Sequence, residues 1–124
     1  MTPTASKLRV CFFEAGCQWV PFLLDRMEHC HEVAVGRGCW EYRAKRSSME
    51  YARGGNIYFG FEVDDRILPE AIDMLGPDVF IYASDIPHGD REWDSVQKLN
   101  SRTDIDESAK QKLLVDNGLR FYGL

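Results

Sequence analysis

Three apolar runs recur along the sequence, and each ends at a carboxylate. The first, LRVCFF at residues 8–13, is apolar at both alternating sets of positions, which is typical of a parallel strand covered on both faces. NIYFGFE at residues 56–62 and VFIYAS at residues 79–84 repeat the pattern. We therefore predict three strands, which end in order at Glu14, Glu62 and Asp85.

In the segments that follow these predicted strands, apolar residues recur at helical spacing. An amphipathic helix is predicted from Trp19 to at least Met27, with Pro21 in its first turn. RILPEAIDML at residues 66–75 predicts a second helix that Gly76 and Pro77 stop. Its N-terminal cap is expected to be Asp64 or Asp65. Two further helices are expected, at residues 94–101 and 107–117.

This βαβαβα order, with one terminal helix, predicts parallel strands joined by right-handed crossovers. In open α/β sheets and in eight-fold barrels, the working face lies at the carboxyl ends of the strands. Glu14, Glu62 and Asp85 are all expected at that face. Each could instead cap a helix or be a solvated loop acid. As a converging set they favour a site for zinc, manganese or magnesium, or a general acid and base.

Three strands with helices on one side leave the other side of the sheet uncovered. Val10, Phe12, Ile57 and Phe59, or their neighbours, would then face water. An eight-fold barrel needs about 250 residues, whereas this sequence has 124. We therefore expect a complementary barrel fragment or a homo-oligomer to cover the sheet.

Composition narrows the class of protein. With 44% hydrophobic and 28% charged residues, the sequence is typical of one globular domain. Its net charge of -5 argues against a nucleic-acid partner. No signal peptide or membrane span is recognisable, so we expect a cytoplasmic protein with a flexible N-terminus at residues 1–7. The cysteines match no zinc spacing, and we expect reduced, mostly buried thiols at Cys11, Cys17, Cys30 and Cys39.

Four further residues are candidates for chemistry. His88, in the loop SDIPHGD, is placed to contact substrate, or else stabilises the turn around Pro87. Arg46, in a basic segment with Arg43 and Lys45, could bind a substrate carboxylate or belong to a solvated face. His29 and His31 are expected near a helix end. If the helix continues there, side chains two apart diverge by about 200° and cannot chelate one ion. The alternative to a metal role is an exposed helix end, where histidines favour the helix dipole.

Four blocks of the sequence resemble, in order, the C-terminal portion of the amidohydrolase-related family. These are FFEAGCQWVPFLLDRM, MEYARGGNIYFGFEVDD, LPEAIDMLGPDVFIYASDIPHGD and AKQKLLVDNGLRFYGL. The branch they resemble includes aminocarboxymuconate-semialdehyde and resorcylate decarboxylases. The resemblance implies that residues 8–124 form strands six to eight of a TIM barrel. Asp85 then falls on the aspartate that, in the family, binds the catalytic metal or orients its water, whereas Glu14 stands where many members have a histidine.

The resemblance also implies a function. In the complete barrel a zinc or manganese ion would support hydrolysis or decarboxylation of small organic substrates. Asp85 and Glu14 would be catalytic, Asp85 the metal ligand, and His88 and Arg46 substrate contacts. The family's other metal-binding histidines precede the matched blocks, so this chain alone is expected to bind no metal tightly. The alternative is a non-catalytic remnant or a dimerising interaction module.

Overall fold

The structure of the protein is a computed structural model, and the residues described are 8–38 and 44–124. A parallel three-stranded sheet forms its centre, in the order β1–β2–β3. The strands are β1 (Val10–Phe12), β2 (Ile57–Gly60) and β3 (Phe80–Ile81). The predicted parallel α/β arrangement is confirmed, although each strand is shorter than its apolar run. The residues that follow each strand leave the sheet as loops.

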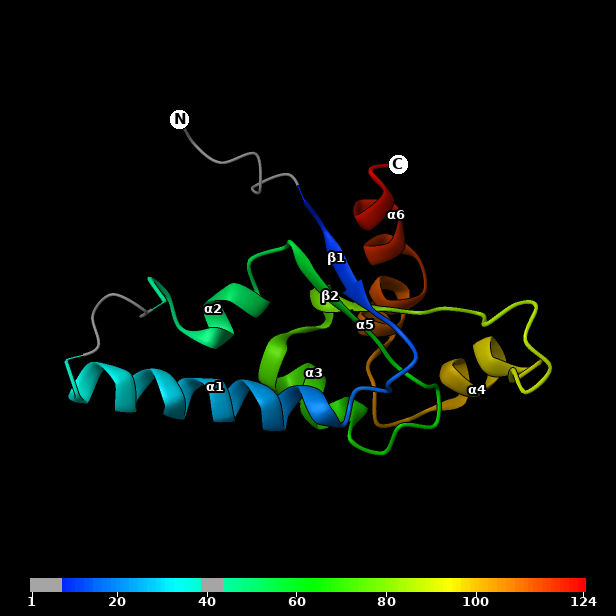
Figure 1. Cartoon of the computed structure of the whole chain (residues 1–124). Coiled ribbons are helices and arrows are strands. Elements are labelled where there is room, and N and C mark those ends of the chain that lie inside the picture. The colour runs from blue at the N-terminus through cyan, green and yellow to red at the C-terminus, as the bar shows by residue number, and fades with distance from the viewer. Residues whose placement is uncertain (1–7, 39–43) are drawn as a thin grey trace.

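Helices connect and flank these strands (Figure 1). The segments are α1 (Trp19–Gly36), α2 (Ser48–Ala52), α3 (Leu68–Leu75), the 3-10 turn η3 (Pro77–Val79), α4 (Ser95–Ser101), α5 (Glu107–Gln111), the π-helical turn η4 (Lys112–Asp116) and α6 (Asn117–Tyr122). Figure 1 shows α1 as a long rod extending beyond the sheet, with α2 against it.

The structure corrects two predicted helix ends and adds one helix. Because α1 continues to Gly36, His29 and His31 lie inside the helix rather than at its end. The last helical segment runs to Tyr122 instead of stopping at residue 117. The helix α2 was not predicted from the sequence. Its capping box, in which Ser47 and Glu50 bond each other's backbone N–H, is a recognisable sequence signal for a helix start.

The prediction that Asp64 or Asp65 caps the following helix is wrong. The N-cap of α3 is Ile67, which makes no side-chain hydrogen bond there. The Asp65 carboxylate is buried and turned toward the loop before α1, where it accepts the Cys17 N–H at 2.8 Å. The hydrogen-bond partner of this carboxylate is therefore distant in sequence, and the spacing of residues around Asp65 does not reveal it.

The hydrophobic core lies between the sheet and the helices. Phe59 and Phe80 pack with α1 and α3 residues such as Val20 and Leu68. On the opposite face of β2, Tyr58 is fully buried. Its ring packs edge to face against Phe121 of α6, with 5.3 Å between the ring centroids. The expected bare sheet face is therefore wrong for β2, because the terminal helix reaches it.

The outer edge strand does remain uncovered. Val10 is 38% exposed and Phe12 47%, and in the described parts of the chain β1 pairs only with β2. The prediction of an apolar surface open to water therefore holds at this edge. An unpaired strand edge with apolar side chains is a surface that soluble proteins usually cover.

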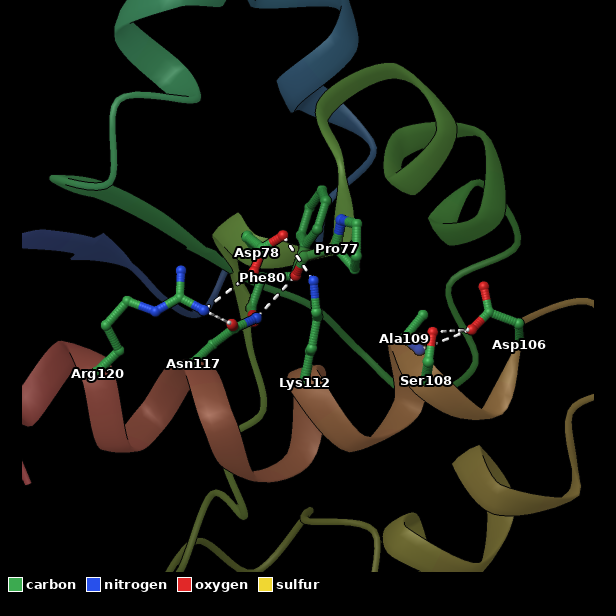
Figure 2. A network of polar contacts seen from close by, with 9 residues as sticks. All are labelled: Pro77, Asp78, Phe80, Asp106, Ser108, Ala109, Lys112, Asn117 and Arg120. Carbon is green, nitrogen blue, oxygen red and sulfur yellow. Dashed lines mark hydrogen bonds and ion pairs between the residues drawn. The ribbon is translucent and has the colours of Figure 1, made fainter.

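A polar network fastens the C-terminal helical segment to β3 (Figure 2). Asn117 is fully buried, and its Nδ2 donates to the carbonyls of Pro77 and Phe80 at 2.7 and 2.8 Å. Asp78 is bridged by Lys112 and Arg120 at 2.9 and 3.0 Å. These contacts hold the segment against the chain that leads into β3 and then to Asp85.

The cysteine prediction is only partly correct. Cys11, Cys17 and Cys30 are free thiols, but Cys17 alone among them is buried and Cys30 is exposed. Burial raises the pKa of Cys11 to about 11. Cys39, Arg43 and the predicted flexible N-terminus at 1–7 lie outside the described residues. Within residues 8–38 and 44–124, no helix is both long and apolar enough to span a membrane.

Candidate functional site

A cavity of about 210 Å³ opens at the carboxyl ends of the strands. The loop after β1 contributes Glu14, and the loop after β2 contributes Glu62. The long segment between β3 and α4, which projects from the sheet in Figure 1, supplies Asp85 and Arg91. The three carboxylates that follow the three strands therefore do line one site, as parallel strands require.

Three potential metal ligands gather at this face. Glu14, Asp85 and His88 each offer a ligand atom, and these atoms lie within 4.8 Å of one another. His88 Nδ1 is 2.6 Å from Asp85 Oδ1. The His88 N–H also donates to the Asp85 carbonyl at 2.8 Å, closing a turn that contains a cis Ile86–Pro87 bond. Two carboxylates and an imidazole are a donor set that zinc and manganese accept.

Backbone conformation sets this cluster apart from its surroundings. Glu14 has φ 64° and Asp85 φ 54°, and they are the only non-glycine residues with positive φ in the described parts of the chain. Such conformations cost an L-residue about 1–3 kcal/mol and collect at functional sites. Both strained positions belong to the three-residue cluster. The backbone conformations that place the Glu14 and Asp85 carboxylates thus lower the free energy of unfolding.

Glu62 is another acidic residue of the cavity lining. Partial removal of solvent raises the pKa of its carboxyl group, and repulsion from Asp65 and Asp64, then from Glu14 and Asp85, raises it further. Glu62 therefore holds its proton to a higher pH than an ordinary glutamate does. A carboxyl group with a raised pKa can donate and accept protons at a higher pH than an ordinary one.

Asp65 ties the Glu14 and Glu62 loops together. Its Oδ2 accepts the N–H groups of Cys17 and Glu62, at 2.8 and 3.1 Å. Gln18 donates to the other oxygen. A Cβ on Gly16 would lie 3.2 Å from both Asp65 oxygens and closer still to Gln18, so this position favours glycine. The single buried carboxylate therefore sets how closely the two loops approach.

The predicted site residues do not all meet. Glu14, Asp85 and His88 converge, whereas Arg46 is exposed just before α2 and is not among the described residues that line the cavity. Sequence reasoning missed the basic side chain that does line it, Arg91. No periodicity or motif marks Arg91, because its position depends on the path of an irregular loop. His29 and His31 join no cluster of potential ligands in the described residues.

Parallel βα units with converging acidic residues at the strand ends define a partial α/β barrel. Residues 4–124 match the amidohydrolase family. The chain belongs to that family. Its fold is also similar to the crystal structure of an amidohydrolase from Mycobacterium avium subsp. paratuberculosis K-10, with 24% identity and a TM-score of 0.75. That match covers 94% of this chain and 28% of the mycobacterial chain, so the present chain spans under a third of it.

Proposed function

We propose that this chain forms the C-terminal part of the catalytic face of a metal-dependent hydrolase or decarboxylase. The observation that supports this most is the convergence of Glu14, Asp85 and His88, whose ligand atoms lie within 4.8 Å of one another beside the cavity. Amidohydrolases typically use divalent metals. The site fits such an ion because Glu14 and Asp85 supply carboxylate oxygens, and His88 lies beside Asp85, where it can orient that ligand.

Each residue of the site takes a separate role in this proposal. Asp85 is a metal ligand and accepts a proton, while His88 orients its carboxylate through the 2.6 Å contact. Glu14 is a second ligand. Glu62 exchanges a proton with the substrate or leaving group, for which its raised pKa suits it. Zinc or manganese, when bound, would supply Lewis-acid activation and charge neutralisation at this face.

Substrates in this proposal are small organic molecules bearing a carboxylate, amide or ester. In hydrolysis, Asp85 takes the proton from the attacking water. In decarboxylation, the site stabilises the charge that remains as carbon dioxide leaves. Either reaction needs the remaining strands of the barrel, because the chain matches only 28% of the similar amidohydrolase. Residues outside this sequence, or a partner chain, would supply them.

Calorimetric titration with Zn²⁺ and Mn²⁺ tests the metal site in the isolated chain. We expect weak, reversible binding that dialysis against a chelator removes, since the cluster is largely open to solvent. Glu14→Gln and Asp85→Asn should each weaken it by about tenfold, the equivalent of 1.4 kcal/mol. The control is Asp73→Asn, on the exposed side of α3. Equal affinity in all four proteins, or no binding by the unaltered chain, would refute the proposed site.

A second function, as a dimerising module without catalysis, is favoured by one surface. Leu23, Met27, Cys30 and Ala34 line an apolar groove along α1 at the alternating four- and three-residue spacing of helix–helix seams. The open edge of β1 is also apolar at Val10 and Phe12. Sedimentation velocity should then show a dimer that Met27→Glu disrupts. A monomer that binds no hydrophobic dye would rule this function out.

A further inference from the structure

Arg91 is the one cationic side chain among the described residues that line the candidate site. The other charged residues of the lining are five carboxylates: Glu14, Glu62, Asp85, Asp90 and Glu92. A cavity of this charge repels an anionic ligand, even after a divalent cation offsets two of the charges. Binding a carboxylate there therefore requires a positive group, and Arg91 provides it.

The Arg91 guanidinium is held in place without being neutralised. Its Cζ atom lies 3.4 Å from the centre of the Trp93 ring, so one face stacks on the indole. One terminal nitrogen, Nη1, donates to the His88 carbonyl at 2.8 Å. In the described residues Arg91 forms no ion pair with any carboxylate, although acidic residues surround it. Stacking and one hydrogen bond thus orient a charge that remains available.

One edge of this guanidinium lacks a partner. Nε is shut off from solvent and makes no hydrogen bond in the described structure. A buried donor left without an acceptor costs about 1–3 kcal/mol, and more when the group is charged. The Nε–H and the adjacent Nη2–H point the same way and form the fork that matches the two oxygens of a carboxylate.

We propose that Arg91 binds the carboxylate group of the substrate through its Nε–Nη2 edge. This inference rests on the proposed function and assigns its substrate class, an organic carboxylate. Nη1 stays on the His88 carbonyl, so the loop that carries Asp85 also fixes the anchor. Nε is shut off from solvent in the free chain, so the groups that cover it must move aside as the carboxylate takes up both bonds.

Titration of the chain with benzoate, followed by NMR of the arginine side-chain N–H signals, tests the anchor. Benzamide, a neutral isostere, is the matched probe. We expect benzoate to shift the Arg91 Nε–H signal and benzamide to leave it in place. Arg91→Gln should weaken benzoate binding by about tenfold or more, as expected for a charged hydrogen bond. Arg91→Lys keeps the charge and loses the fork. Its affinity for benzoate should lie between those of the unaltered chain and of Arg91→Gln.

The control variant is Arg66→Gln, because Arg66 is exposed and lies on a different surface hollow. Circular dichroism confirms that each variant is folded. No benzoate binding by the unaltered chain, equal affinity in Arg91→Gln, or equal binding of benzamide would each overturn the proposal.

Repeating the titrations with and without Zn²⁺ separates this inference from the metal site. If Arg91-dependent benzoate binding persists while Zn²⁺ binding is absent, the anchor stands and the proposed metal function fails. If Zn²⁺ binds through Asp85 and benzoate affinity is the same in Arg91→Gln, the anchor fails and the metal function stands.

Discussion

A substitution at Glu14 tests directly whether the backbone conformation at the candidate site lowers the free energy of unfolding. The residue has φ 64° and an exposed side chain, and no hydrogen bond of that side chain is seen in the described structure. Glu14→Gly removes the carboxylate and supplies the residue type that adopts this backbone conformation freely. The chain should therefore become more stable as it loses a potential metal ligand.

The expected gain follows from two opposing terms. The left-handed conformation costs an L-residue about 1–2 kcal/mol, which glycine avoids. Glycine also raises the entropy of the unfolded chain, which costs about 0.4–1 kcal/mol. The net change is a rise of about 1 kcal/mol in the free energy of unfolding. Relief of repulsion between Glu14 and Glu62 acts in the same direction.

Urea unfolding followed by tryptophan fluorescence measures this change, with Ala15→Gly as the matched control. Ala15 is also exposed and is not among the residues with positive φ, so glycine there brings only the entropic cost. We expect the urea midpoint to rise for Glu14→Gly and to fall for Ala15→Gly, at an unchanged m-value. Zn²⁺ affinity should drop in the first variant only. A loss of stability in Glu14→Gly as large as that of its neighbour would refute the reasoning.

Three further outcomes are expected. Asp85→Asn should change the free energy of unfolding by less than about 1 kcal/mol, because asparagine tolerates the left-handed backbone. The same change should lower turnover of a reconstituted barrel by orders of magnitude. A large loss of stability, with activity falling only in proportion to the folded fraction, would show a structural role. Asn117→Asp should destabilise the chain by about 2 kcal/mol or more, because a carboxylate oxygen would replace the amide that donates to two carbonyls; an unchanged thermal midpoint contradicts this. Hydrogen bonding from Lys112, then from Arg120, lowers the pKa of Asp78, so its stabilisation is present above the unfolded value near 3.9 and is lost as pH falls through the folded value. Asp78→Asn should accordingly lower the urea midpoint at pH 7 and leave it unchanged near pH 2, and a pH-independent difference would count against the ion pairs.

Local patterns in the sequence predicted much of the fold. Apolar runs predicted the three strands, and three- and four-residue spacing predicted α1 and α3, because both signals depend only on which neighbouring residues face the core. Parallel strands place their carboxyl ends at one face, so the order of the elements was enough to assign Glu14, Glu62 and Asp85 to a common site. That assignment needed topology and no side-chain geometry.

Tertiary structure decided the rest, because those features depend on residues distant in sequence. Asp65 accepts the N–H of Cys17, 48 positions earlier in the chain, and does not cap the helix that follows it. Tyr58 is buried because α6 folds back against it, which removed the expected bare face. Arg91, and not Arg46, reaches the cavity because an irregular loop carries it there. Periodicity records which side of an element is buried, whereas packing between distant segments determines what each buried or loop side chain meets.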